Sequence, residues 1–478
     1  MSRINTNVSS LIAQRTLATD NANLQTSLQR LSTGLKINSG ADDPAGLIAS
    51  ENLKSEQAGI TQAIGNAQRA SNIIGTAEGG LNEVSSLLTQ VQSLVSQSAN
   101  SGGLSTDEIS ANQLQVDSIL STVNRIAGST QFQGKKLLNG DYAYTTSTAQ
   151  ASAFASLQVN AAHLADNTTT SVVVQVTNSA TTGEVGFTAT NINAGRGYTN
   201  GVTPVTIQIA GNAGTEQLSF AASTTLSSVA TAINNIKSVT GVSATVAGTS
   251  LKIDATNFGA SQFVSVQATA GTFTVTGGTS GKAFGKDAAV NVNGASATVD
   301  GKNVTYRTNG LDLDFSLSSG LNNGKTKTFG ITGGGAQFSL GSKVTEADKA
   351  DIGIQSVSTG SLGDGTLGFL SSLSSGGANS LTSGNLVSSQ KIVDEAIKQV
   401  SSLRGRLGAF QKFTIGSTIN SLGVAFENAS AAESAIADTD FSSETANLTR
   451  SQILSQAATT VLSQANSAPQ AVLTLLRG

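Results

Sequence analysis

Apolar residues recur at intervals of four and three at both ends of this 478-residue chain. Near the carboxyl end the spacing is 4-3-4-3-4-3, which places every member on one stripe of a helix. The amino end carries a 4-3-4 repeat, preceded by three residues spaced 4-3. A narrow apolar stripe on a terminal helix needs partner helices, either the opposite terminus or another copy of the chain, which indicates assembly rather than catalysis. The carboxyl stripe is Leu454, Ala458, Val461, Ala465, Ala468, Val472 and Leu475, and the amino-terminal residues are Ile4, Val8, Leu11, Leu24, Leu28, Leu31 and Leu35.

The same spacing continues inward from each end and predicts three further helices. The first ends near Ser101-Gly102-Gly103, and the second opens with the capping-box pair Ser105 and Glu108. The third runs from about 388 to 435, roughly 70 Å. Antiparallel rods of this kind bury their stripes together as a bundle. The predicted inward positions are Leu81, Val84, Leu88, Val91 and Val95, then Val116, Ile119, Val123 and Ile126, then Val393, Ala396, Val400, Leu403, Leu407 and Phe410.

Two prolines interrupt the helical pattern. The turn formers from Asn38 to Gly46 predict a break before Pro44. Within them Asp42 and Asp43 could suggest a metal site, but adjacent acids beside proline are typical of a turn or a helix start. Pro469 lies inside the final stripe and predicts either a kink or a restart of the helix.

The middle of the chain differs in composition from both ends. Residues 141–379 hold thirty-two of the 51 glycines and all four tyrosines. Short β-branched runs predict strands at 171–176, 205–209 and 251–255. The residues from 226 to 239 predict one helix. Hairpin turns are predicted at Asn293-Gly294, Asp300-Gly301, Asn309-Gly310 and Asn323-Gly324, and a turn or linker at Gly333-Gly334-Gly335, which no phosphate-loop lysine follows.

Composition excludes several function classes. Charged residues are 12% of the chain and the net charge is -3, so neither a nucleic-acid-binding face nor a polybasic membrane anchor is expected. There is no Cys, and the single histidine, His163, is read as a surface or loop residue. No nucleophile has a plausible base, so we expect no catalytic, cofactor-binding or metal site, and no enzyme. No apolar run is long enough to span a bilayer, and the first ten residues, MSRINTNVSS, lack the order of a cleaved signal peptide.

Several stretches carry a specific resemblance. INTNVSSLIAQRTL, SLQRLSTGLKINSGADDPAGLIASENL and FQGKKLLNG resemble the amino-terminal region of bacterial flagellin. ENASAAESAIADTDFSSETANLTRSQILSQAATTVLSQANSAPQAVLTLLRG is similar to its carboxyl terminus, including the proline within the final stripe. The match covers about half of the chain, roughly 1–140 and 385–478. TLSSVATAINNIKSVTGVSATV also resembles an insert module found in flagellin middles.

The resemblance implies a self-assembling structural subunit of the flagellar filament, the propeller for motility. The expected fold is mixed, with a long coiled-coil or bundle core from both termini and a β-rich variable middle that projects outward. The two terminal stripes would form an inner tube and the inward positions of the longer helices an outer tube. The implied domains are 1–43 with 437–478 for the inner tube, 44–165 with 350–436 for the outer tube, and 166–349, possibly as two subdomains, for the variable middle.

The resemblance also implies a location and partners. The family is exported through the hollow filament without a cleaved signal and is located outside the cell. The implied partners are other copies of the chain, an export chaperone, and the cap and hook-filament junction proteins. A host Toll-like receptor commonly senses flagellins through the helix ending in a QSAN-type stretch, which makes Gln90, Leu94 and Gln97 receptor-facing candidates. Gln90, Gln92 and Ser93 replace charged residues of the family motif, which weakens the expected binding, and these residues can equally be a solvated helix face.

Two other functions remain open at this point. A hook-filament junction protein has similar ends but occupies one position in a few copies. A secreted adhesin would place its activity in the middle and would not require both termini. The matches in STGLKINSGADDPAGL favour flagellin.

Overall fold

A computed structural model describes residues 6–100, 102–147, 153–164, 168–188, 204–221, 224–308, 310–318, 321 and 323–477, with side chains described as far as 468. The chain forms two compact units. Unit 1 comprises Met1–Ala70, Ser339–Lys349 and Lys412–Gly478, and unit 2 comprises Ser71–Phe338 and Ala350–Gln411.

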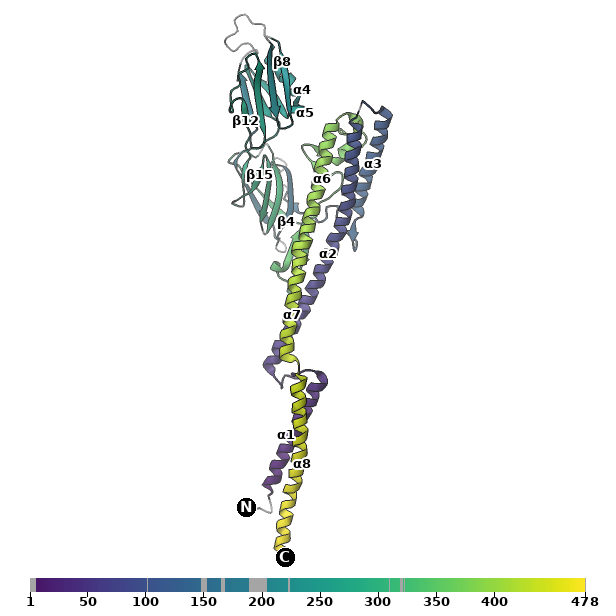
Figure 1. The fold of residues 1–478 in the computed structure, drawn as a ribbon, viewed down its shortest axis with the longest axis vertical. Helices are drawn as coiled ribbons and strands as arrows, with labels where there is room; N and C mark the ends of the chain where they lie inside the picture. Colours follow the sequence, from purple (N-terminus) through teal and green to yellow (C-terminus); the bar gives the residue numbers. More distant parts are fainter. Residues whose placement is uncertain are drawn as a thin grey trace. The chain divides into compact units, whose positions relative to one another are not determined.

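Unit 1 contains the two terminal helices, α1 (Val8–Thr33) and α8 (Phe441–Arg477), lying antiparallel to one another (Figure 1). The side chain of Asn7 accepts the N–H of Ser10 at 3.1 Å and caps the start of α1. Gly34, with φ of 76°, ends α1 in the left-handed conformation that glycine adopts without strain. The assigned helix α8 runs through Pro469 without a restart.

The predicted turn before Pro44 is confirmed. Helix α2 (Pro44–Ser98) begins at that proline. Asp42 Oδ2 accepts the N–H of Ser39 at 2.8 Å, and these hydrogen bonds hold the pKa of the Asp42 carboxyl below its ordinary value. Asp43 Oδ1 accepts the N–H of Gly46 at 2.9 Å. The two acids therefore make a turn and a helix start, as expected.

The three further helices predicted between the terminal stripes are present. Helix α3 (Thr106–Ser129) opens with the predicted capping box, in which Ser105 and Glu108 cap each other's backbone. The predicted 388–435 helix is observed as α6 (Leu386–Ala409), a π-helical turn (Phe410–Gly416) and α7 (Ser417–Ala437) in succession. The short elements outside the two β cores are β1 (Gln131–Phe132), β2 (Lys135–Lys136), β19 (Ala336–Ser339), β20 (Lys349–Ile352), β21 (Gly363–Asp364), β22 (Gly368–Phe369) and the 3₁₀ turns Glu346–Asp348, Leu370–Leu373 and Leu381–Ser383.

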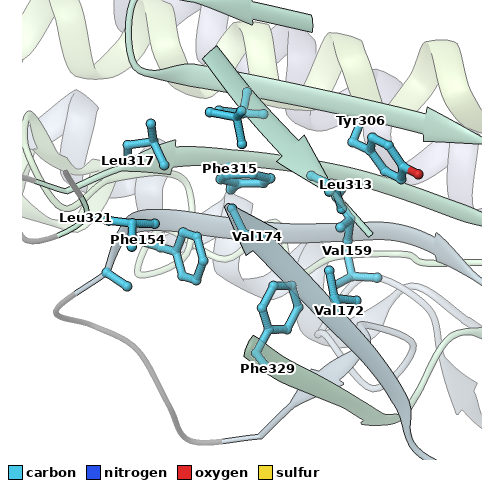
Figure 2. Close-up of a cluster of buried hydrophobic side chains, with 14 of the residues drawn as sticks. Phe154, Val159, Val172, Val174, Tyr306, Leu313, Phe315, Leu317, Leu321 and Phe329 are labelled. Atoms are coloured by element: carbon cyan, nitrogen blue, oxygen red, sulfur yellow. The ribbon is translucent and has the colours of Figure 1, made fainter. Parts of the chain in front are cut away.

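The first β core of unit 2 is an antiparallel sandwich. A five-stranded sheet in the order β14-β13-β5-β18-β3 and a four-stranded sheet in the order β15-β16-β17-β4 share one hydrophobic cluster. Figure 2 shows its side chains converging, with the Phe154 ring 5.3 Å from that of Phe315 and 5.7 Å from that of Phe329. The strands are β3 (Thr145–Thr146), β4 (Phe154–Ala162), β5 (Thr170–Asn178), β13 (Ala289–Val292), β14 (Ala295–Ser296), β15 (Thr298–Asp300), β16 (Asn303–Thr308), β17 (Leu311–Leu317) and β18 (Thr326–Gly333).

A second β core has its own hydrophobic cluster. Sheets in the orders β12-β11-β7-β8 and β6-β10-β9 enclose it together with α4 (Leu226–Asn235). Where the two cores join, Asp287 Oδ1 accepts the N–H groups of Ala260 at 2.9 Å and Gly301 at 2.8 Å, which lowers the pKa of that carboxyl. The strands are β6 (Glu184–Thr188), β7 (Val205–Gly211), β8 (Thr215–Phe220), β9 (Val242–Ala247), β10 (Ser250–Ala255), β11 (Phe263–Ala270) and β12 (Lys282–Phe284).

The three predicted strands are confirmed as β5, β7 and β10, but two local predictions are wrong. The predicted helix 226–239 is interrupted at Ile236, so that α4 is followed by a separate turn, α5 (Lys237–Thr240). Asn323-Gly324 does not close a hairpin, because β18 pairs with β5 and β3 rather than with the preceding β17.

Two of the other predicted turns connect neighbouring strands. Asn293 and Gly294, both with positive φ, connect β13 to β14 as predicted. Gly301, also with positive φ, follows the end of β15 at Asp300 and leads into the paired strand β16. Asn309 of the remaining turn lies outside the described residues.

Candidate assembly surfaces

The contact between α1 and α8 combines leucines with small and polar residues. On α1 the residues turned toward α8 are spaced 3-4-3-4-3-4, and on α8 they are spaced 4-3-4-3-4-3. Leucines occur at five of these positions, and serine or alanine at seven, so that large and small side chains share the contact. The contact positions are Ser10, Ala13, Leu17, Asp20, Leu24, Ser27 and Leu31 of α1, and Glu444, Leu448, Ser451, Ser455, Ala458, Leu462 and Ala465 of α8.

Polar contacts tie α1 to α8 along its length. Asn7 Nδ2 donates to the carbonyl oxygen of Ala465 at 2.7 Å. Ser455 Oγ donates to Asn21 Oδ1 at 2.9 Å. Residues early in α1 thus meet residues late in α8, as an antiparallel pair requires. We refer to α1 and α8 together as the terminal helix pair.

The predicted stripes coincide with this contact only in part. Leu24, Leu31, Ala458 and Ala465 lie on it. Leu35 does not continue the helix, because Gly34 ends α1 and Leu35 pairs in a β-bridge with Asp438. Ile4 lies outside the described residues, as do the side chains of Val472 and Leu475. The predicted residues that are exposed in the single chain are Val8, Leu11, Leu28, Leu454, Val461 and Ala468.

The predicted stripe therefore lies partly on the contact within the chain and partly on the exposed surface, and its role in assembly stays a prediction. The 4-3 spacing was read from apolar residues alone, whereas the contact also includes serines and acids. The two sets share positions 458 and 465, and the predicted Leu454 and Val461 each precede a contact residue, Ser455 or Leu462, by one position. The terminal helix pair thus keeps several apolar side chains in contact with solvent.

Three large exposed apolar residues of the terminal helices were missed from the sequence. Ile12, Phe441 and Ile453 are each more than half exposed. Ile12 and Ile453 each lie next to a predicted residue, and the paired apolar residues Leu11-Ile12 and Ile453-Leu454 were the available signal. An exposed apolar set on a helix pair indicates a surface that another molecule covers.

The predicted bundle positions in unit 2 are mostly buried. Helices α2, α3 and α6, which carry them, lie side by side (Figure 1). Gln92 of α2 donates to Asp394 of α6 at 2.8 Å, and Asn112 of α3 donates to Ser98 of α2 at 3.2 Å. Ile119, Ile126 and Phe410 are half-buried. The buried members are Leu81, Val84, Leu88, Val91, Val95, Val116, Val123, Val393, Ala396, Val400, Leu403 and Leu407.

The receptor-facing candidates lie on the last turns of α2. Gln90 and Gln97 are exposed, and Leu94 is half-buried. The amide of Gln92 contacts Asp394, so that glutamine contributes to helix packing within the subunit.

The described residues contain few features of reactive chemistry. Nowhere among them do three or more metal-ligating side chains gather. His163 Nδ1 lies 3.2 Å from Asp351 Oδ2 at a partly exposed position. No helix in the described ranges has the length and hydropathy needed to cross a membrane.

The chain has a terminal helix pair with exposed apolar residues, a helical bundle and two β cores. These features are those of a structural protein that assembles with copies of itself. Residues 4–143 match the bacterial flagellin N-terminal helical region, residues 390–476 the bacterial flagellin C-terminal helical region, and residues 206–265 the flagellin hook IN motif. The last of these contains the predicted insert module.

Curated relatives match along the full length. Flagellin D of Vibrio anguillarum is 32% identical over 482 residues, and the B-type flagellin of Pseudomonas aeruginosa is 34% identical over 502 residues, with 99% of each chain covered in both cases. The flagellar junction protein FlgL from Legionella pneumophila is 12% identical, with 81% of this chain and 99% of that chain covered and a TM-score of 0.29. That similarity is too weak to support a junction protein.

The chain belongs to the bacterial flagellins. It is a subunit of the flagellar filament, the extracellular helical polymer that drives motility, and its role is structural.

Proposed function

We propose that the terminal helix pair is the surface through which neighbouring subunits join, and that it forms the inner tube of the filament. The observation that carries this proposal is the exposed apolar set on α1 and α8. Covering such side chains on assembly removes them from water and stabilises the polymer. A contact between two different surfaces of identical subunits generates a helix when the rotation between them does not close into a ring.

The remaining domains follow the same scheme. The inner tube comprises 1–43 with 437–478, and the outer tube comprises 44–165 with 350–436. Residues 166–349 form the variable middle, projecting outward, and β3 and β4 join its first β core from the preceding segment. The burial of apolar residues on α2, α3 and α6 supports a rigid outer-tube bundle, because such residues hold packed helices together.

Export and partners complete the proposal. The subunit leaves the cell without a cleaved signal peptide, held unfolded by an export chaperone, and is added between the junction proteins and the cap. A chain without Cys suits such transit, because no disulfide can form while it is unfolded.

For the host receptor, we propose weak recognition at Gln90, Leu94 and Gln97. Glutamine offers no charged, bidentate donor where the family motif has a basic residue. Receptor-reporter cells should respond more strongly to Gln90→Arg than to the unaltered protein. An equal response would contradict this assignment.

The assembly proposal is tested by placing a charge on the exposed apolar set. Leu454→Asp and Val461→Asp should each abolish growth on short filament seeds, seen by electron microscopy, because a carboxylate buried at a subunit contact has no partner. Since both positions are about half exposed in the single chain, the circular dichroism of the monomer should not change. Normal filaments from both variants would overturn the proposal.

A further inference from the structure

A short antiparallel backbone contact joins the segment after α1 to the segment before α8, and we call this end of the terminal helix pair its base. Just after α1, the N–H of Lys36 donates to the carbonyl oxygen of Ala437 at 2.7 Å. Just before α8, the N–H of Thr439 donates to the carbonyl oxygen of Gly34 at 2.9 Å. Leu35 and Asp438 lie opposite one another between these bonds. Segments about 400 residues apart in the sequence thus meet at the point where α1 ends and α8 begins.

An ion pair lies beside this backbone contact. Arg30 Nη1 is 3.7 Å from Glu444 Oε2, and Glu444 is only 7% exposed. A buried carboxylate is costly unless a cation faces it, so the position of Glu444 depends on Arg30. Arg30 lies in the last turn of α1 and Glu444 in the first turn of α8, where each charge also complements its helix dipole.

The rest of the helix contact specifies register weakly. Serine and alanine occupy half of its positions, and Leu17, Leu24 and Leu31 of α1 repeat every seven residues. A shift of one heptad therefore brings a leucine of α1 back to the place of the previous one, and the apolar contacts alone discriminate little between the two registers. The hydrogen bonds from Ser10 to Asn466 and from Ser455 to Asn21 each end on an exposed asparagine, whose amide oxygen water can reach instead.

We propose that this base contact is the element that sets the register of α1 against α8 of the same chain, and that Arg30 and Glu444 are its specificity-determining residues. We call it the terminal clasp: Arg30, Gly34, Leu35, Lys36, Ala437, Asp438, Thr439 and Glu444. The inference rests on the proposed function, because the register of α1 against α8 sets the positions of the exposed apolar residues of one helix relative to those of the other. It also favours pairing within one chain over an exchange of α1 between neighbouring subunits.

Charge reversal tests the ion pair. Arg30→Glu or Glu444→Arg should raise the critical concentration for seeded polymerisation at least about tenfold, because two like charges then share a largely buried site. The double exchange restores opposite charges and should bring the value back to within about fivefold of the unaltered protein, the remainder reflecting charges reversed against the helix dipoles. Lys237→Glu makes the same change of charge at an exposed position of α5, outside the terminal helix pair, and should have little effect.

Register is read directly by disulfide formation. The chain has no Cys, so introduced pairs are its only thiols. Ser10→Cys with Asn466→Cys joins positions whose side chains lie 2.7 Å apart. Ser10→Cys with Thr459→Cys tests a position one heptad away, about 10 Å along the helix and beyond disulfide reach. The first pair should oxidise faster in the full-length chain. Arg30→Glu should remove that preference, and the double charge exchange should restore it.

The outcomes separate the clasp from the assembly proposal. If Arg30→Glu polymerises normally and keeps the crosslink preference, or if the double exchange restores neither, the clasp is wrong. Should Leu454→Asp fail to polymerise in the same series, the assembly surface stands without the clasp. If Leu454→Asp and Val461→Asp both polymerise normally, the assembly surface is wrong, and the crosslink preference still decides the clasp.

Discussion

Shortening two exposed apolar residues of α8 should weaken filament growth without unfolding the subunit. Leu454 and Val461 lie seven residues apart and are 46% and 58% exposed in the single chain. Full burial of such a side chain contributes about 1.5–3 kcal/mol, so covering the exposed half contributes roughly 1 kcal/mol at each position. Leu454→Ala combined with Val461→Ala therefore removes about 2 kcal/mol per added subunit.

That loss corresponds to a rise of roughly 30-fold in critical concentration, since each 1.4 kcal/mol is about tenfold. The assay is seeded polymerisation over a series of protein concentrations, with polymer measured by sedimentation. Val246→Ala is a matched control, because Val246 is 39% exposed on β9 of the second β core and belongs to unit 2 and not to the terminal helix pair. A change of less than about threefold in the double variant, with the same monomer stability, would refute the reasoning.

Three further changes test the interior of unit 2. Leu88→Ala should destabilise the subunit by about 2–5 kcal/mol in chemical denaturation, because Leu88 is fully buried and its loss leaves a cavity; a loss below about 1 kcal/mol would argue against a packed bundle. Ser105→Ala should cost about 1 kcal/mol through loss of the α3 cap, whereas Ser105→Asp should keep most of it. Asp287 has a folded-state pKa below its ordinary value of 3.8, so its contribution is present above that value and is lost as the pH falls through the lowered pKa. The stability difference between the unaltered protein and Asp287→Asn should therefore narrow on acidification below about pH 4, and a difference that widens would contradict this.

The sequence predicted the helices well because their signals are local. The capping residues before α3, the proline at the start of α2 and the 3-4 spacing of buried positions each act within a few turns. Gly34 also marks the end of α1, but the predicted stripe included Leu35, which lies beyond that glycine. A glycine at a helix end outweighs an apolar repeat, because it adopts the left-handed conformation without strain.

The contact face of the terminal helices could not be chosen from the sequence alone. Two 4-3 repeats run along α8 one residue apart, one through Leu454 and Val461 and the other through Ser455 and Leu462. A periodic pattern does not say which of these faces meets the same chain and which meets a neighbour. Only the structure shows that Ser455 and Leu462 face α1 and that Leu454 and Val461 stay exposed. Similarly, Asn323-Gly324 has the residues of a hairpin turn, but tertiary pairing joins β18 to β5 instead.

The most direct test of the account asks whether assembly covers the exposed face of α8. Leu454→Cys and Val461→Cys each introduce a single thiol, since the chain has none, and Val246→Cys provides a reference on β9. The rate of modification by a maleimide is compared between monomers and seeded filaments. The account predicts that the thiols at 454 and 461 react readily in the monomer and become protected in filaments, while the thiol at 246 reacts equally in both. Equal reactivity of the 454 and 461 thiols in monomer and filament would contradict the claim that this face joins the subunits.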